Sequence, residues 1–211
     1  MDALEAILTR RSTRLMKPVL PPRECIEQIV EAGRYAPSGS NSQSTRFIII
    51  TDPAVLQMLA ELVQTAFASM EADEHTYVSL RNSITAAKRG GGYRFHYDAP
   101  VLIVTANRKE YGNAMADSAC ALENMMIAAN ALDIGSCWIN QLHWLSEVPA
   151  VRACMETLGM TKDEFVTGGL ILGYPIDAMP ERTPLKRTGN PVVWIEPNTE
   201  RVNVHGVEGR T

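Results

Sequence analysis

Residues 113–133 form the strongest predicted helix of this chain, and its apolar surface is wider than a single stripe. Apolar side chains recur at helical spacing through the segment, namely Met115, Ala119, Leu122, Met126 and Ala129. A helix with such a wide apolar surface has to be buried on more than one side. Two arrangements meet this demand equally well. The helix lies in the middle of one core, or it lies at an interface between two chains.

Four short strands are predicted around this helix. Residues 46–51 contain one phenylalanine and three isoleucines, which favour a buried pleated strand. Residues 101–106 form a second apolar strand, and residues 135–139 and 166–174 are predicted as two more. Helical and strand patterns therefore alternate along the chain, without repeats or a low-complexity linker.

Two helices are predicted before the first strand. The first begins with Asp2 and Glu5, which match a capping box. Its apolar stripe consists of Leu4, Ile7 and Leu8. The second helix opens at Pro22, because proline is favoured in the first turn, and ends near Gly33.

Composition limits the classes of protein that fit. A length of 211 residues suits one domain with a sizeable core, so residues 1–211 are expected to form a single domain. The net charge of -4 does not favour nucleic-acid binding, which usually needs a basic excess. The longest apolar runs are far too short to span a bilayer, and the first residues show no signal segment. We therefore expect no nucleic-acid partner and no membrane partner.

The cysteines and histidines do not indicate a metal site. The four cysteines are widely spaced, at Cys25, Cys120, Cys137 and Cys154, and the four histidines are scattered. No metal ligands are therefore expected. Reduced thiols and a cytoplasmic location are the default for such cysteines.

Two further segments are set apart by their composition. Residues 72–97 are polar and contain three consecutive glycines, which indicates a mobile excursion or lid. The tail, residues 198–211, contains little material for a core. It is expected to be disordered or to add a strand to a neighbouring chain.

Two polar motifs lie in the first quarter of the chain. Residues 10–14 read Arg-Arg-Ser-Thr-Arg, and guanidinium and hydroxyl donors together suit a phosphate. Residues 36–43 read Ala-Pro-Ser-Gly-Ser-Asn-Ser-Gln, whose small side chains and amides suit the edges of a flat heterocycle. Each segment alone is better explained as a charged helix end or a surface turn. Their occurrence together indicates half of a mononucleotide site.

In this order, the two motifs resemble those of the flavin-dependent nitroreductase family, which has an R-R-S-x-R run followed by a P-S-x-x-N-x-Q loop. Further matches extend the resemblance along nearly the whole chain: Asp98-Ala99-Pro100, residues 132–139, residues 172–175, and the pair Lys186-Arg187. The resemblance implies an α+β fold of three layers, with a central, mainly antiparallel sheet flanked by helices. It also implies an intertwined homodimer with residues 113–133 at the interface and two FMN sites.

The resemblance further assigns residues to the FMN phosphate, ribityl chain and pyrimidine edge. Arg10, Ser12 and Arg14 match these positions, and Lys186 and Arg187 match a late basic segment that closes on the phosphate. The adjacent Arg11 is included in the cofactor site. Neighbouring side chains on a helix diverge, however, which would direct Arg11 towards solvent.

A second set of residues is assigned to the flavin ring. Pro37, Ser38, Gly39 and Asn41 match the loop that reaches the ring from the partner chain, although Ser44-Thr45 replaces the family's usual Pro-Trp. Cys137, Trp138 and Ile139 match a strand end whose main-chain N–H groups face the flavin N5 and O4. Arg94 is a further candidate shortly before the Asp98 motif.

The implied activity is that of an FMN-dependent oxidoreductase. NADH or NADPH would reduce nitroaromatic, quinone or similar electron-poor acceptors by ping-pong hydride transfer. The chemistry would be carried by FMN N5 with no catalytic side chain, and Arg14 is the candidate for stabilising negative charge at the flavin N1 and O2 edge.

Three alternatives to this activity stay open. They are a narrower flavin enzyme of the same fold (dehalogenase-like or flavin-oxidative), a non-catalytic flavin-binding protein, and a hydrolase with Cys137 as nucleophile. The third is disfavoured, because no histidine or acid lies at a recognisable offset from Cys137.

Overall fold

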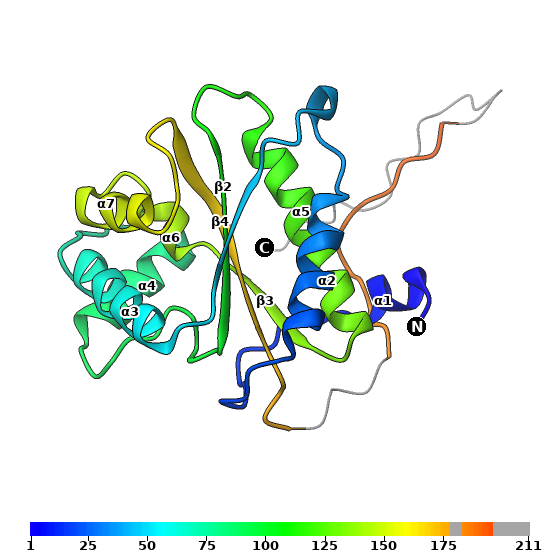
Figure 1. The fold of residues 1–211 in the computed structure, drawn as a ribbon, viewed down its shortest axis with the longest axis horizontal. Helices are drawn as coiled ribbons and strands as arrows, with labels where there is room; N and C mark the ends of the chain where they lie inside the picture. Colours follow the sequence, from blue (N-terminus) through cyan, green and yellow to red (C-terminus); the bar gives the residue numbers. More distant parts are fainter. Residues whose placement is uncertain (178–182, 196–211) are drawn as a thin grey trace, which may run out of the picture.

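The computed structural model describes residues 1–177 and 183–195. A four-stranded sheet lies between two layers of helices, with α1, α2 and α5 on one face and α3, α4, α6 and α7 on the other (Figure 1). The helices are α1 Ala3–Thr9, α2 Arg23–Arg34, α3 Pro53–Ala68, α4 Val78–Lys88, α5 Ala114–Ala131, α6 Gln141–Trp144 and α7 Pro149–Thr157, with a short 3-10 turn at Gly39–Asn41. The strands are β1 Arg46–Ile50, β2 Val101–Arg108, β3 Gly135–Ile139 and β4 Glu164–Gly173.

The sheet has the strand order β1-β2-β4-β3, and every neighbouring pair is antiparallel. Side chains alternate between its faces, as a period of two requires. Val101 and Ile103 of β2 pack with α2 and α5, whereas Leu102 and Val104 pack with the helices of the other layer. Because both faces are covered, the central strands β2 and β4 are mainly apolar, and their few polar side chains, such as Thr105 and Thr167, are buried as well. The predicted α+β fold with a mainly antiparallel sheet is confirmed.

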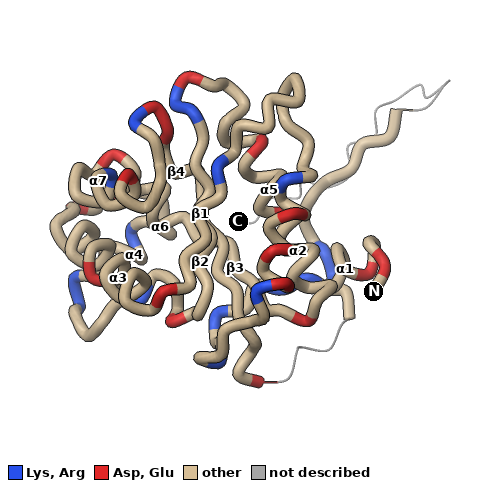
Figure 2. The backbone as a smooth tube through the Cα atoms, in the orientation of Figure 1, with Lys and Arg blue, Asp and Glu red and all other residues tan. Residues whose placement is uncertain are grey.

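The four predicted strands all exist, with small differences at their ends. β2 continues two residues beyond the predicted end to Arg108, and β4 begins two residues early at Glu164. The charged residues of the molecule lie mainly on the outer surfaces of the helices and in the turns, while the sheet is uncharged through its centre (Figure 2). Within the described residues, no helix is both long and apolar enough to cross a membrane.

Helix α5 packs along the sheet and against α2, as its wide apolar surface predicted. Leu122, Met126 and Ala129 are buried, and so is Met125. Met115, at the start of the helix, is partly exposed instead. Helix α5 is therefore part of the core of a single chain, and its N-terminal end carries an exposed apolar side chain, that of Met115.

Helix α1 exposes its apolar stripe and packs on α5 with another side. Asp2 caps the helix by accepting a hydrogen bond from the Glu5 main-chain N–H, but the predicted apolar stripe faces solvent, with Leu4 at 71% exposure. The side that packs on α5 is the one with Ala6 and Thr9, whose oxygens both accept hydrogen bonds from the amide of Asn130 at 3.0 Å. The stripe of Leu4, Ile7 and Leu8 is thus an uncovered apolar surface.

The polar segment 72–97 contains a helix that the sequence did not predict. Helix α4 buries Ile84 and Ala87 in the core beside α3, and Phe95 is also buried. Helices α6 and α7 were not predicted either. Whether residues 72–97 move as a lid stays a prediction, and the predicted tail, residues 198–211, lies outside the described residues.

Candidate functional site

Residues 10–17, which we call the N-terminal arm, run beside the start of β3 and the end of β4. The Thr13 main-chain N–H donates to the carbonyl of Ser136 at 2.8 Å, and Ser12 forms an isolated bridge with Ser136. Further along, the Lys17 N–H donates to the carbonyl of Tyr174 at 2.7 Å. These contacts place the arginine motif against the edge strand of the sheet.

The arm can approach β3 this closely because position 135 has no side chain. A Cβ atom on Gly135 would lie 2.9 Å from the Thr13 Cγ2 and 3.0 Å from the carbonyl oxygen of Gly173. In an extended segment, alternate side chains point in opposite directions. Thr13 therefore packs against Gly135, while Ser12 and Arg14 are directed away from it.

Three predicted residues of the arm influence the thiol of Cys137 in β3. Burial raises the pKa of the Cys137 thiol, against opposing effects of the Arg14 charge, a hydrogen bond with Ser12 and the Arg10 charge. Cys137 is 1% exposed, and its raised pKa keeps the thiol protonated near neutral pH. The hypothesis of a Cys137 nucleophile therefore gains no support, because nucleophilic cysteines are reactive as thiolates.

The guanidinium of Arg14 lies beside an aromatic ring that was not predicted from the sequence. Its guanidinium carbon lies 5.9 Å from the centre of the Tyr97 ring, within range of a cation–π contact. Arg94, the weaker candidate, forms an ion pair with Asp98 at 3.3 Å. Tyr97 is therefore a support for Arg14 that only the fold reveals.

Arg10 and Arg11 make different contacts. The Arg10 Nε lies 3.6 Å from a carboxylate oxygen of Glu123 on α5. The Arg11 guanidinium donates to the carbonyls of Thr9 and Arg10, both at 3.0 Å, and to the carbonyl of Thr183. Arg11 therefore caps the end of α1 with main-chain contacts and is less available to a phosphate than Arg10.

Residues 183–195, which we call the C-terminal segment, carry the predicted basic pair. The contact of Arg11 with Thr183 brings the start of this segment to the end of α1, and the segment then runs past the α1, α2 and α5 layer (Figure 1). Lys186 and Arg187 are exposed there. The segment thus brings two cations to the same side of the molecule as the arm.

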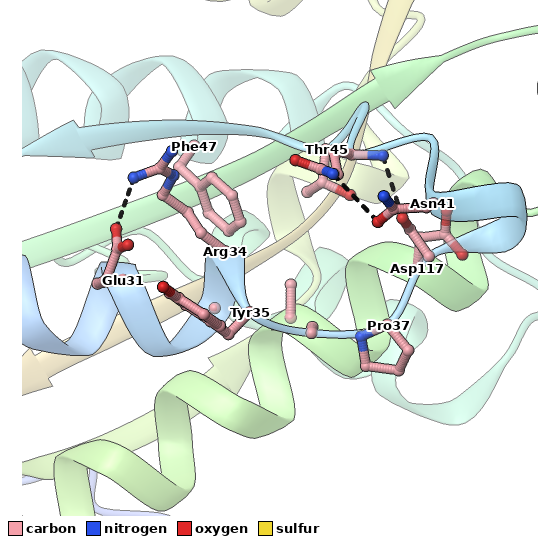
Figure 3. A pocket seen from close by; sticks show the side chains of 13 residues that line it. Glu31, Arg34, Tyr35, Pro37, Asn41, Thr45, Phe47 and Asp117 are labelled. Atoms are coloured by element: carbon pink, nitrogen blue, oxygen red, sulfur yellow. Dashed lines mark hydrogen bonds and ion pairs between the residues drawn. The ribbon is translucent and has the colours of Figure 1, made fainter.

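The predicted loop, residues 36–43, borders a cavity of about 490 Å³ beside α2 and α5 (Figure 3). Pro37, Ser38 and Asn41 line this cavity, together with Arg34 and Tyr35 from the end of α2. The Gly39 main-chain N–H donates to the carboxylate of Asp117 on α5, a residue that also lines the cavity (Figure 3). Asp117 was not predicted from the sequence, although a buried acid within an apolar helix is a usable signal.

The arm and the 36–43 loop contact different parts of α5. The loop contacts Asp117 in the first turn of the helix, whereas Arg10 of the arm lies beside Glu123 in its middle. A rise of about 1.5 Å per residue separates these two positions by roughly 9 Å along the helix axis. Helix α1, which leads into the arm, contacts Asn130 still further along the helix.

A metal centre is not formed by the part of the chain that the structure describes. Among residues 1–177 and 183–195, no group of three histidine, cysteine or acidic side chains is arranged to hold a metal ion.

Comparisons with known proteins identify the family of this chain. The model of the Nitroreductase family matches residues 7–174. A nitroreductase from Bacteroides fragilis, solved with bound FMN, superposes with a TM-score of 0.81 at 33% identity, covering 93% of this chain and 100% of that chain.

Two relatives are similar in sequence over most of their length. A nitrobenzene nitroreductase from Ectopseudomonas oleovorans is 28% identical over 186 residues, which cover 75% of this chain and 80% of that protein. An FMN reductase (NADPH) from Bacillus subtilis is 25% identical over 206 residues, 96% of this chain and 76% of that protein. The family match spans both polar motifs and all four strands of the sheet, so the chain belongs to the nitroreductase family.

Proposed function

We propose that this chain is an FMN-dependent oxidoreductase that uses NADH or NADPH to reduce nitroaromatic, quinone or similar electron-poor acceptors. The observation that carries the proposal is the position of the arginine motif, residues 10–14, along the edge strand β3, where Thr13 donates to the Ser136 carbonyl and Ser12 forms a bridge with Ser136. Family membership and the printed names of the relatives support the same reaction class.

The residues of this site fit FMN, which combines a phosphate, a hydroxylated chain and a flat ring. Arg10 would bind the phosphate with Lys186 and Arg187, since guanidinium and ammonium groups form strong charge-assisted hydrogen bonds with phosphate. Ser12 offers a hydroxyl to the chain of the cofactor, and Arg14 offers positive charge to the pyrimidine edge of the ring. When bound, FMN supplies the hydride-transfer chemistry that amino-acid side chains do not provide.

The main chain of β3 is suited to the ring. β3 pairs with β4 on one side only, so its outer edge presents N–H and C=O groups beyond the contact with Thr13. Because the groups of successive residues face opposite edges of a strand and the Ser136 carbonyl faces the arm, Trp138 presents its main-chain groups on the outer edge, whereas those of Cys137 and Ile139 face β4. We therefore assign the ring edge to the main chain of Trp138, with Cys137 and Ile139 holding that strand end in place. Main-chain donors at a strand end keep their position whatever the side chain, which suits a fixed cofactor.

We further propose a homodimer in which each FMN lies between the arm of one chain and the 36–43 loop of the other. The contacts of the arm and the loop with separate parts of α5 support this arrangement. Uncovered apolar side chains near both segments offer a surface for a second copy. They are Leu4, Ile7 and Leu8 of α1, Met115 of α5, and Val192, Trp194 and Ile195 of the C-terminal segment.

A cytoplasmic location is part of the proposal. The four cysteines are free, as expected in a reducing compartment.

An absorption spectrum of the purified protein tests the proposed activity. We expect a yellow protein that loses its visible absorption on addition of NADH or NADPH alone and regains it when a quinone or nitroaromatic compound is added. This sequence of events, with parallel double-reciprocal lines, follows if donor and acceptor use one face of the ring in turn. A colourless protein would contradict the assignment of FMN, and a yellow protein unaffected by both nicotinamides would indicate a flavin-binding protein without this activity.

A further inference from the structure

The carboxylate of Asp117 connects α5 to the 36–43 loop. Asp117 lies in the first turn of α5 and is 7% exposed (Figure 3). Its two oxygens lie 3.1 and 3.2 Å from the Gly39 main-chain nitrogen, which donates to them. The Tyr111 hydroxyl donates to the same carboxylate at 2.7 Å and accepts from the Ser42 hydroxyl at 3.0 Å. One buried carboxylate therefore holds two points of the loop, directly at Gly39 and through Tyr111 at Ser42.

The loop makes its own local structure with a different set of bonds. The Asn41 N–H donates to the carbonyl of Ser38 at 2.9 Å, and the Gln43 N–H donates to the Ser38 hydroxyl at 3.0 Å. Ser40, Asn41 and Gln43 have φ angles of 51°, 54° and 48°, in the left-handed region that side chains rarely adopt. The internal bonds shape this strained turn, but they do not fix its position on α5.

Close packing strengthens the dependence of the loop on Asp117. A Cβ atom on Gly39 would overlap the amide nitrogen of Asn113 and lie 2.6 Å from the Tyr111 hydroxyl. The Gly39 main chain thus lies against the start of α5, where an added methyl group would displace the Asn113 amide and the Tyr111 hydroxyl. The Tyr111 hydroxyl is also a donor to the Asp117 carboxylate, so the packing of Gly39 and its hydrogen bond involve the same residues.

We propose that Asp117 is a positioning residue that holds the 36–43 loop in place for the FMN bound to the arm of the partner chain. The inference rests on the proposed function and deepens it, because it assigns the geometry of each site to a carboxylate of the opposite chain. Burying a carboxylate is costly unless it is hydrogen-bonded. Here the Asp117 carboxylate holds the loop next to Ser38 and Asn41, two residues that are assigned to the flavin ring.

Replacing Asp117 by asparagine tests whether the carboxylate fixes the position of the 36–43 loop. Asp117→Asn keeps the shape of the side chain. One carboxylate oxygen is replaced by an NH₂ group, which cannot accept a hydrogen bond from the Gly39 N–H or the Tyr111 hydroxyl, and the negative charge that strengthens these bonds is lost. We expect faster hydrogen exchange of the main-chain amides of residues 36–44 in the FMN-free protein, and FMN affinity weakened by about tenfold or more. The carboxylate also accepts from the Ser42 hydroxyl at 3.4 Å. Tyr111→Phe removes one of these donors and should give a smaller change of the same kind.

Asp52→Asn is the matched control. The Asp52 carboxylate also accepts from a main-chain N–H, that of Ala54 at 2.8 Å, but it caps α3 away from the loop. Asparagine is an equally good N-cap residue, so exchange in residues 36–44 and FMN affinity should both stay at wild-type values. Unchanged exchange of residues 36–44 in both Asp117→Asn and Tyr111→Phe would overturn the proposal.

Mixed dimers test whether Asp117 acts on the site of the other chain. One chain carries Asp117→Asn and the other Arg10→Ala, with different affinity tags so that the mixed species can be isolated. If the loop serves the partner's FMN, one site combines both defects and the other has neither. We therefore expect one site of wild-type FMN affinity per mixed dimer. If each loop serves its own chain, every site carries one defect and no wild-type site exists, which would refute the proposal.

Two further measurements keep these outcomes separate from folding and from the proposed function. Gly39→Ala displaces the loop by steric overlap and leaves the Asp117 carboxylate in place. In the mixed dimer it should therefore give the same FMN affinities as Asp117→Asn. With two variants available, the test can still be made if one of them folds poorly. A wild-type protein that binds no FMN would contradict the proposed function. The exchange measurement on the FMN-free protein would then still decide whether Asp117 holds the loop.

Discussion

At the scale of single residues, the buried imidazole of His96 couples stability to pH. His96 is 4% exposed, and neither ring nitrogen has a hydrogen-bond partner among the described residues. Burial lowers the pKa of His96, although Asp98 raises it, and Arg94 lowers it further. The unfolded chain therefore binds the proton more readily than the folded one, so stability rises with pH. We expect the free energy of unfolding to decrease as the pH falls below about 6.5, by at most about 1.4 kcal/mol per pH unit from this group.

The variant His96→Leu should lose this part of the pH dependence, because leucine fills the buried position without titrating. Denaturant unfolding at about pH 7.5 and about pH 5.5, on either side of the ordinary histidine pKa, measures the difference. His75→Leu is the control, since His75 is exposed and should leave the pH dependence unchanged. An equal loss of stability in wild type and His96→Leu would show that other groups account for the whole effect.

At the scale of elements, the contact between the arm and β3 depends on the absence of a side chain at position 135. In Gly135→Ala the new methyl group would meet Thr13 and the Gly173 carbonyl, so the arm has to shift. We expect a loss of about 1–3 kcal/mol in the free energy of unfolding, which is usual for overpacking, and weaker FMN binding because Ser12 and Arg14 move with the arm.

Gly112→Ala provides the comparison for this element. Nothing lies within 4 Å of the position that its Cβ would take, and its φ lies outside the left-handed region. Thermal unfolding and FMN titration of both variants measure the two expected effects. If Gly135→Ala keeps wild-type stability and affinity, the arm does not depend on close packing against β3.

At the scale of the whole molecule, the exposed apolar stripe of α1 predicts a dimer that persists when the protein is diluted to low concentration. The double variant Leu4→Glu/Leu8→Glu places two charges on this surface, where burial against a second copy would be costly. We expect it to sediment as a monomer and to lose FMN, because each site would lack the loop of the other chain.

Met58→Glu is the matched control for the dimer. Met58 is about as exposed as Ile7 of the α1 stripe, but it lies on α3 in the opposite helical layer (Figure 1). This variant should sediment as the wild type does and keep its FMN. A wild-type chain that sediments as a stable, FMN-loaded monomer would contradict both the dimer and the shared site.

The local pattern of apolar residues in the sequence made much of the fold predictable. Residues 46–51, 101–106, 135–139 and 166–174 were predicted as strands, and residues 113–133 as a helix, because burial imposes a short period on neighbouring positions. Helix α4 was not predicted, because its exposed positions are polar and only a few side chains such as Ile84 reach the core.

The sequence by itself determined the family, through two polar motifs and further matches in a fixed order, and it predicted the strands and the long helix that carry them. The tertiary structure decided which of these positions meet. It placed Ser12 beside Ser136 and Gly39 beside Asp117, and it brought the arm and the loop to separate parts of α5. It also turned the stripe of α1 outwards and directed Arg11 to main-chain carbonyls. Periodicity reports whether a position is buried, but contacts between distant segments depend on how the whole chain packs, and no local pattern encodes them.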